Sequence, residues 1–337
     1  MPVRLGGVDV LIIGGTSFVG RAIAQSALRD HHVTVLNRGR TPSDLPASVE
    51  RLIGDRSGDL RCLADRHFDA TIDCIAYRPS DVDRLADALG DRGGHHVHIS
   101  SVAAYDQPPV GATEASSTLF ADDPTLADQP VTSATYGPLK ASSERRAVSR
   151  FDAVTVVRPT YVIGAHDVTM RFPYWVDRAR RGGEIAVPGP TSDTLQYIDA
   201  RDLADFVVRL AATATTGAVH VAGPDPAAGY VETIVRVIDH LAPADTTITL
   251  IDPAVVAREG LANRFPLWPG PANESAVDVD SALALSLGLT RRPLEASVDE
   301  VAAWWMHQPR PDWWLRPDQE ASLRRTGTTA TTPADRA

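Results

Sequence analysis

The sequence predicts an α/β fold: a doubly wound parallel sheet of the Rossmann type with a smaller C-terminal substrate lobe. Strand-like and helix-like segments alternate through about the first 160 residues, as in sheets whose strands are linked by helices. The strand-like segments are rich in Val and Ile with little polar alternation, so we expect both of their faces to be buried. The first of them ends in Gly14-Gly15 and passes at once into a helical pattern at Phe18.

Apolar runs in the first part of the chain predict strands at 8–13, 33–37, 50–53, 69–75, 95–100 and 153–158, with helices at 18–29, 58–66, 80–91 and 136–150. Later segments predict helices at 171–182, 200–212, 230–241, 253–260 and 295–307, and strands at 218–222 and 247–251. We therefore expect a Rossmann domain (1–165), a substrate-binding lobe interleaved with the last sheet strands (166–316) and a flexible tail (317–337). The Pro-, Asp- and Thr-rich segment 106–135 is predicted to be a functional loop or lid.

The composition narrows the class of partner. The 337 residues include 33 Lys and Arg against 43 Asp and Glu, a formal net charge of −10, which does not favour binding to nucleic acid. No apolar run is long enough to span a membrane, and the N-terminus has no small-residue cleavage pattern. Two cysteines cannot form a disulfide framework. We expect a cytoplasmic protein with a small-molecule substrate, and a homodimer stays open.

The glycine corner after the first strand predicts an anion site. The first backbone N–H groups of the following helix have no partner within the helix, and with the helix dipole they attract a phosphate. Gly14 allows a pyrophosphate to approach the backbone, and Gly20 lets the helix pack closely on the sheet. We expect Thr16, Ser17, Phe18 and Val19 to complete this dinucleotide-binding turn. A tight turn without a ligand is the alternative.

The end of the second strand bears on the choice of dinucleotide. An acidic residue there would accept a hydrogen bond from the adenosine ribose, but the sequence has Asn37 and Arg38, with Arg40 nearby. Because arginine suits a 2′-phosphate, NADP(H) is favoured as the cofactor and NAD(H) stays possible. The alternative for Arg38 is a solvated loop arginine without a ligand. After the third strand, Asp55 is expected to reach the adenine amino group and Arg56 to assist with phosphate.

Tyr136 and Lys140 form the candidate catalytic pair. Four residues apart on a helix, they share a face. A phenol has an ordinary pKa of about 10, and a neighbouring ammonium brings it towards neutral pH. Pro138 is tolerated in a first turn, so we expect the helix to begin near Tyr136. At the end of the fifth strand, Ser101 is the candidate to orient the substrate oxygen, with Ser100 as the alternative.

These motifs together resemble the extended and atypical branch of the short-chain dehydrogenase/reductase superfamily, of the NAD(P)-dependent epimerase/dehydratase type. The resemblance covers roughly residues 8–310 and rests on GGTSFVGR, LNRGRT, GDR, SSVAAY, YGPLKASSE, VVRPTYVIGAHD and QYIDARDLA. It implies a Ser101-Tyr136-Lys140 triad, with Lys140 also holding the nicotinamide ribose. It further implies that the cofactor is contacted by Cys74, Ile75, Ala76, Pro159 and Val162. Ser17 departs from the family, because sugar epimerases usually carry a third glycine there.

Candidates for substrate contact are more scattered. Tyr77 and Tyr105 lie just beyond strand ends, where pocket-lining residues gather. His166 and Arg171 follow the sixth strand, although a turn or the core explains them as well. Gln196 resembles the family's substrate-side strand. His96 and His98 share a strand face without a third ligand, so we expect structural histidines and no metal site.

Three functions remain open. The main expectation is a redox enzyme that moves hydride between nicotinamide and a substrate carbonyl or hydroxyl, with Tyr136 as general acid or base. The alternative is epimerisation or dehydration of a nucleotide-sugar, with NAD recycled at each turnover. A cofactor-sensing regulator without catalysis is the third, and it is disfavoured because Tyr136 and Lys140 are both present. The substrate itself is not predicted, because one fold serves many compounds.

Overall fold

A computed structural model describes residues 7–115, 118–270, 278–326 and 329–331, and it divides the chain into two compact units. Unit 1 comprises the described parts of Met1–Val162, Ile198–Gly223 and Val279–Arg291. Unit 2 comprises the described parts of Ile163–Tyr197, Pro224–Asp278 and Arg292–Ala337. The chain thus returns to unit 1 twice after the expected boundary at residue 165, because the last strand of the main sheet is supplied from beyond residue 198.

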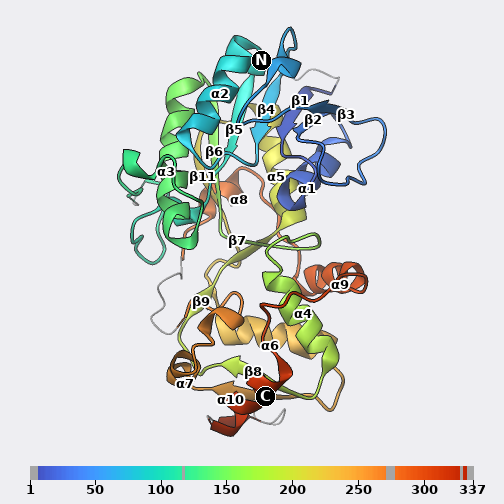
Figure 1. The fold of residues 1–337 in the computed structure, drawn as a ribbon, viewed down its shortest axis with the longest axis vertical. Coiled ribbons are helices and arrows are strands. Elements are labelled where there is room, and N and C mark those ends of the chain that lie inside the picture. Colours follow the sequence, from blue (N-terminus) through green and yellow to red (C-terminus); the bar gives the residue numbers. More distant parts are fainter. Residues whose placement is uncertain (1–6, 116–117, 271–277, 327–328, 332–337) are drawn as a thin grey trace. The chain divides into compact units, whose positions relative to one another are not determined.

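Unit 1 is built on a seven-stranded sheet in the order β11-β6-β5-β4-β1-β2-β3, whose six strand pairs are all parallel (Figure 1). Its strands are β1 (Asp9–Ile13), β2 (His32–Asn37), β3 (Glu50–Ile53), β4 (Ala70–Asp73), β5 (His95–Ile99), β6 (Val154–Pro159) and β11 (Gly217–Val221). In the register of the central pair, Val10 lies opposite Val33 and Ile12 opposite Val35. The predicted fold class, a doubly wound parallel sheet, is confirmed.

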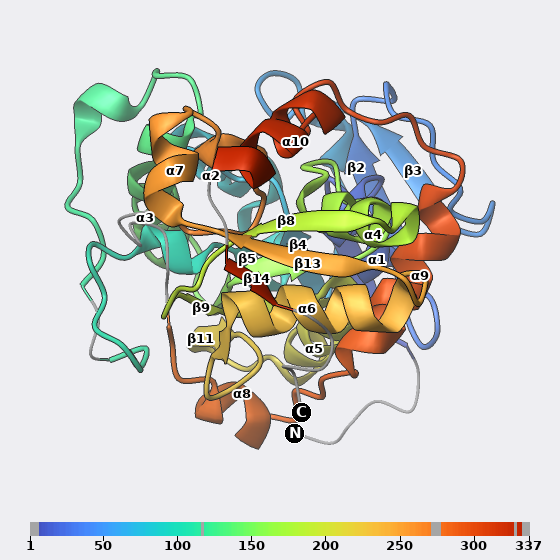
Figure 2. The same ribbon diagram turned by 90° about the horizontal axis from the view of Figure 1, so that it is seen from below.

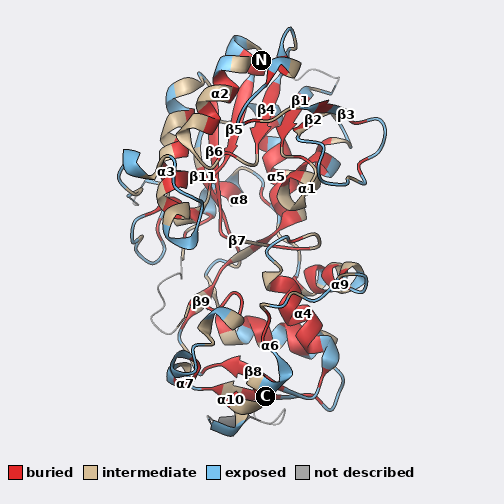
Figure 3. Cartoon of the chain, in the orientation of Figure 1, coloured by how far each residue is buried: buried red, intermediate tan, exposed pale blue. Residues whose placement is uncertain are grey.

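Helices cover both faces of this sheet, as the sequence of β1 requires. Val10 and Ile12 enter a core with α1 (Phe18–Ala27) and α5 (Ala200–Thr213), while Leu11 and Ile13 enter a second core with α2 (Pro79–Leu89). Because alternate residues of one strand enter different cores, the strand shows no polar alternation. Figure 3 shows the buried strands between the helices. Helix α3 (Ser133–Arg150) packs beside α2, and α8 (Ala282–Ser286) beside β11.

Short 3-10 helices replace some of the expected regular elements of unit 1. They are η1 (Arg61–Leu63), η2 (Gly90–Gly93), η3 (Val102–Ala104) and η4 (Pro124–Leu126). The predicted helix at 58–66 is reduced to η1, because Asp65 takes a left-handed conformation with φ of 59° that ends the helical path. The chain passes between the units at β7 (Tyr161–Ile163) and β10 (Tyr197–Asp199).

Unit 2 combines helices with a small sheet. Its helices are α4 (Arg171–Arg181), α6 (Tyr230–Leu241), α7 (Pro253–Arg258), η5 (Ala262–Arg264), α9 (Leu294–Trp305) and α10 (Pro317–Thr326). Its strands are β8 (Glu184–Pro188), β9 (Thr194–Leu195), β12 (Ala228–Gly229), β13 (Thr247–Ile251) and β14 (Thr329–Thr331). Figure 2 shows β8 beside β13, with which it pairs in parallel. Trp175, Tyr174 and Tyr230 are fully buried and form the aromatic core of this unit.

The C-terminal segment differs from the flexible tail expected at 317–337. Helix α10 runs to Thr326, and its Leu323 is fully buried. The carboxylate of Glu320 accepts hydrogen bonds from Arg178 Nε at 2.9 Å and from the Ala186 backbone N–H at 3.0 Å. A buried ion pair therefore fixes a helix that has too few apolar residues to show periodicity. Residues 327–328 and 332–337 of the expected tail lie outside the described residues.

Across the ranges that the structure describes, no helix is both long and apolar enough to cross a bilayer.

Candidate active site

The turn between β1 and α1 has the geometry of an anion cradle. Gly14 has a φ of 87°, which favours glycine, and a Cβ at Gly20 would lie only 2.2 Å from the Gly14 carbonyl oxygen. The helix therefore begins directly against the turn. Ser17 occupies the N-cap position, but within the described residues its side chain makes no capping hydrogen bond. The first N–H groups of α1 are thus left for a ligand.

A cavity of about 340 Å³ in unit 1 opens beside this turn. It brings together residues from four separate segments. Those that the sequence predicts for the dinucleotide are Gly14, Thr16, Ser17, Asn37, Arg38, Asp55, Arg56 and Ile75, and Tyr77 was predicted to contact the substrate. It also includes residues that were not among the predicted contacts: Leu36, Arg40, Thr41, Gly54, Ser57, Arg78 and Asp81. Arg78 follows the carboxyl end of β4, so the rule that ligands gather at strand ends would have indicated it.

The end of β2 presents two arginines to this cavity. The side-chain oxygen of Asn37 accepts a hydrogen bond from the Gly39 backbone N–H at 2.7 Å, which fixes the turn. Arg38 and Arg40 are exposed, and neither side chain forms a hydrogen bond or ion pair with another described residue. The rim of the cavity therefore carries two guanidinium groups able to bind an anion.

Arg56 lines the cavity as expected, but its terminal amino groups are bound to neighbouring protein groups. Its Nη1 and Nη2 donate to the two carboxylate oxygens of Asp73 at 2.6 and 2.9 Å, and Nη2 also donates to the Asp81 carbonyl at 3.0 Å. Burial would raise the pKa of Asp73, but the charge and hydrogen bonds of Arg56 hold this pKa well below its usual range. Arg56 thus forms a buried ion pair with Asp73 beside the cavity. Asp55 keeps its place on the lining and accepts from the Ser57 backbone N–H at 2.9 Å.

Helix α3 carries the expected Tyr136 and Lys140. The Lys140 ammonium is buried and donates to the carbonyls of Ala76 at 3.0 Å and Ile99 at 2.8 Å, beyond the end of β4 and at the end of β5. Burial lowers its pKa to about 8. Lys140 Nζ lies 4.6 Å from the centroid of the Tyr77 ring, which lies 6.2 Å from that of Tyr136. Lys140, Tyr77 and Tyr136 thus form one cluster. The sequence had predicted only that Tyr77 lines a pocket.

The start of α3 differs from the expectation. Thr132 caps the helix by accepting from the Thr135 backbone N–H, so the helix begins at Ser133, before Tyr136. Pro138 is therefore inside the helix and not in its first turn. The capping pair of Thr132 and Thr135, which was not predicted from the sequence, stabilises this earlier start.

The two serines after β5 have contrasting surroundings. Ser101 Oγ accepts from the Ala103 backbone N–H at 3.1 Å and caps η3, while its hydroxyl hydrogen is still available to donate. Ser100 is buried, and its Oγ has no hydrogen-bond partner among the described residues. The geometry keeps both serines as candidates.

Several expected cofactor contacts lie at strand and helix ends but do not line the cavity: Phe18, Val19, Cys74, Ala76, Pro159 and Val162. Cys74 is a free thiol, and burial raises its pKa well above the ordinary value. Ala76 contributes its carbonyl to Lys140. The roles of the others stay predictions.

Tyr105 was predicted to line a pocket, but it lies in the interior of unit 1 and is not among the residues that line the cavity beside the glycine turn. Its side chain is buried, its hydroxyl lies 2.6 Å from His220 Nε2, and it accepts from Arg158, which pairs with Glu144. The Glu114 carboxylate accepts from the His220 backbone N–H at 2.8 Å. Tyr105 therefore belongs to a buried polar network, and through Glu114 this network ties the segment expected to be a lid to β11.

The remaining substrate candidates lie in unit 2. His166 has a φ of 64°, and its ring lies 5.3 Å from that of Trp304. Arg171 Nε donates to Thr169 Oγ1 at 2.9 Å, and Gln196 Nε2 donates to the Pro224 carbonyl at 3.2 Å. Their contact with a substrate stays a prediction.

The strand histidines are packed in the interior of unit 1. His96 stacks on Phe151 with ring centroids 3.9 Å apart, and burial lowers the pKa of His96 to about 4. Among the residues with described positions, no three His, Cys, Asp or Glu side chains are grouped to hold a metal ion.

A family model described as the NAD dependent epimerase/dehydratase family matches residues 10–222, which is more than half of the chain. The chain belongs to this family. The match includes the glycine turn, the end of β2 and the Tyr136-Lys140 pair. Comparison with curated proteins gives no significant match.

Solved structures of similar fold include several epimerases. An epimerase from Methanothermobacter thermautotrophicus has 14% identity and a TM-score of 0.67, covering 95% of each chain. UDP-N-acetylglucosamine 4-epimerase from Methanobrevibacter ruminantium, in complex with UDP-N-acetylmuramic acid, has 15% identity and a TM-score of 0.65 over 90% of this chain and 99% of that one. UDP-glucuronic acid 4-epimerase from Bacillus cereus, in complex with NAD, has 16% identity and a TM-score of 0.61 over 88% and 98%. At such identities the likeness shows the fold.

Membership of the NAD-dependent epimerase/dehydratase family supports the expectation of an enzyme that uses an NAD-type cofactor. It favours epimerisation or dehydration, the alternative in the sequence analysis, over the reductase that was the main expectation. The preference for NADP(H) gains no support from the family description.

Proposed function

We propose that the chain is a dinucleotide-dependent epimerase or dehydratase acting on an activated sugar, with Tyr136 as its acid/base. The observation that carries the proposal is the cluster of Lys140, Tyr77 and Tyr136 in the same unit as the glycine turn and its cavity. Membership of the family makes this reaction class the first candidate. The nucleotide-sugar ligand of the Methanobrevibacter enzyme supports that choice of substrate by analogy.

The cavity fits the cofactor. The N-terminus of α1 and the close approach at Gly14 and Gly20 suit a pyrophosphate, and Asp55 offers a carboxylate for an adenine amino group. Lys140 has three N–H donors and gives two to the Ala76 and Ile99 carbonyls, which leaves one for a ribose hydroxyl. When bound, the dinucleotide supplies a carbon centre that accepts and returns hydride.

The residues of the chain handle the proton. Tyr136 accepts the substrate hydroxyl proton as hydride leaves the carbon that bears this hydroxyl, and it returns the proton to the oxygen when hydride comes back. The positive charge of Lys140 favours the phenolate. Ser101, or Ser100 in its place, orients the substrate oxygen by donating its hydroxyl hydrogen. The Arg56–Asp73 pair supports the floor beneath these groups.

A second candidate function is a net reductase that uses NADPH. The specific observation in its favour is the pair of exposed arginines, Arg38 and Arg40, at the end of β2, where no acidic residue is present. Guanidinium groups bind a 2′-phosphate through charge-assisted hydrogen bonds. Tyr136 would then give a proton to the product oxygen, and oxidised cofactor would leave at each turnover.

One experiment separates the two functions. The purified full chain is denatured, and any released nucleotide is identified and quantified. Stoichiometric NAD supports the epimerase or dehydratase. A site that purifies empty and is thermally stabilised by NADPH, but not by NADH, supports the reductase. Absence of both a retained nucleotide and any stabilisation by NADH or NADPH would remove both functions.

A further inference from the structure

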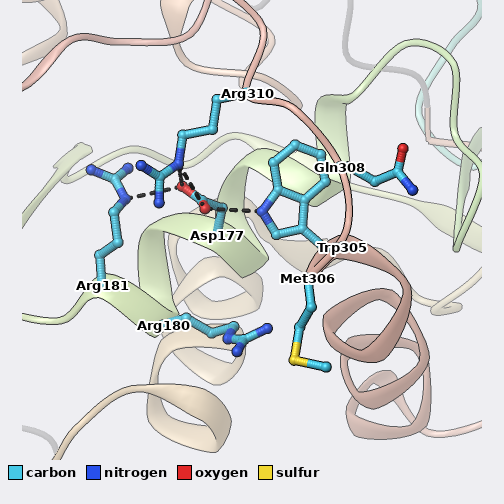
Figure 4. A pocket seen from close by; sticks show the side chains of 7 residues that line it. All are labelled: Asp177, Arg180, Arg181, Trp305, Met306, Gln308 and Arg310. Atoms are coloured by element: carbon cyan, nitrogen blue, oxygen red, sulfur yellow. Dashed lines mark hydrogen bonds and ion pairs between the residues drawn. The ribbon is translucent and has the colours of Figure 1, made fainter.

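A second cavity, of about 630 Å³, lies wholly within unit 2. It is open to solvent between the end of α4 and the segment that follows α9 (Figure 4). Its lining consists of Asp177, Arg180, Arg181, Trp305, Met306, Gln308 and Arg310. None of these residues is used in the proposed reaction.

The centre of this cavity is one carboxylate that organises its cationic neighbours. The Asp177 side chain is only 6% exposed, and Figure 4 shows three donors converging on it. Trp305 Nε1 donates at 2.9 Å, Arg181 Nε at 3.0 Å and Arg310 Nε at 3.0 Å. Asp177 therefore fixes two guanidinium groups in place.

Both of these arginines use only Nε for Asp177. The terminal amino groups of Arg181 and Arg310 have no hydrogen-bond partner among the described residues, and the Arg310 side chain is 60% exposed. Arg180 reaches the same cavity from α4 and donates Nη1 to the Ala302 carbonyl at 3.0 Å, which leaves its other donors unused within the described part of the chain. Guanidinium groups that are already bound to neighbouring protein groups lose less conformational freedom when an anion binds, which favours affinity.

The charges indicate what the cavity accepts. Three arginines against one carboxylate leave two positive charges uncompensated in the lining. A phosphate or phosphate monoester carries about −1.5 to −2 at neutral pH and has three oxygens that can accept hydrogen bonds from guanidinium groups. A carboxylate would neutralise only half of this charge. The volume of about 630 Å³ leaves room for an organic group beyond the phosphate.

We propose that the Arg180-Arg181-Arg310 cavity is a second anion site, which binds a phosphoryl group independently of the dinucleotide cavity in unit 1.

Equilibrium dialysis of the full chain with radiolabelled orthophosphate, at low ionic strength, tests this site. Arg180→Gln and Arg310→Gln are each expected to weaken binding about tenfold, the effect of losing a charged hydrogen bond. Arg258→Gln is the matched control in unit 2, because its exposed side chain pairs with Glu259 and with no other residue whose position is described, and it should leave binding unchanged. Arg180 forms no hydrogen bond or ion pair with Asp177, so the Arg180→Gln variant still tests the site if Arg310→Gln alters folding.

Two further measurements identify the source of the phosphoryl group and distinguish binding in unit 2 from binding in the unit 1 cavity. Glucose 1-phosphate competing more tightly than orthophosphate indicates a phosphate monoester, and the reverse order indicates free phosphate. Arg38→Gln, in unit 1, should preserve binding at the second site. The proposal is overturned if phosphate does not bind at millimolar concentrations, or if binding is lost in Arg38→Gln and kept in both unit 2 variants.

Discussion

Replacing Arg56 by glutamine separates its structural role from a role in phosphate binding. The substitution leaves the Asp73 carboxylate, which is 0% exposed, without the two hydrogen bonds of 2.6 and 2.9 Å that now neutralise it. Removing one partner of a buried ion pair costs about 3–5 kcal/mol, because the remaining charge stays buried and unpaired. Total stability of a domain is about 5–15 kcal/mol, so the loss should be large on that scale.

The free energy of unfolding is measured by urea denaturation of the wild type, Arg56→Gln and the double variant Arg56→Gln/Asp73→Asn. The double variant should recover part of the loss, because it no longer buries an unpaired charge. Arg61→Gln is the control, since Arg61 is exposed and pairs with Asp59 on the surface, and it should unfold like the wild type. An Arg56→Gln protein of unchanged stability that loses affinity for NADPH would refute this reasoning, because Arg56 would then serve the phosphate.

Three further outcomes are expected from the same geometry. Arg38→Gln/Arg40→Gln should raise the Kd for NADPH by about ten- to a hundredfold and leave that for NADH unchanged in fluorescence titrations, because only NADPH has a 2′-phosphate; equal losses would contradict this. The pKa of Lys140 is about 8, below its ordinary value of 10.5, so the ammonium that favours the phenolate is lost as pH rises through 8, and kcat/KM should fall there. Between these two pKa values the unfolded chain binds more protons at Lys140 than the folded chain does, so the contribution of Lys140 to the free energy of unfolding should increase from pH 8 to 10.5. A kcat/KM that does not change with pH would contradict the role assigned to Lys140. Tyr105→Phe should lower the free energy of unfolding by about 1–3 kcal/mol, because His220 and Arg158 lose a buried hydrogen-bond partner, and KM should not change. A raised KM with unchanged stability would indicate that Tyr105 contacts the substrate.

Local patterns were sufficient to predict the sheet and many of the residues that line the unit 1 cavity. The apolar runs of β1 and β2 predict strands buried on both faces, and Asn37 and Arg38 could be placed because ligands gather at the carboxyl ends of parallel strands. The glycine corner could also be recognised from the sequence. A strand that ends in Gly14-Gly15 and enters a helix directly is typical of a turn that binds phosphate at the helix N-terminus.

Contacts between distant segments could not be predicted in this way. Arg56 looked like a phosphate ligand because it follows β3, but its side chain reaches Asp73 on β4, although β1 and β2 separate these strands in the sheet. Tyr105 meets His220 across 115 residues, and Glu320 meets Arg178 across 142. The spacing of apolar residues says nothing about such pairs. Such contacts determine whether a polar side chain is bound within the protein interior or is available to a ligand.

A crystal structure of the full chain with a nicotinamide dinucleotide tests the proposed active site most directly. We expect the pyrophosphate against the first turn of α1 and the Tyr136 hydroxyl within reach of a substrate oxygen placed beside the nicotinamide ring, with Lys140 Nζ on the ribose. A dinucleotide bound outside the unit 1 cavity, or a Tyr136 hydroxyl directed away from the nicotinamide, would contradict it.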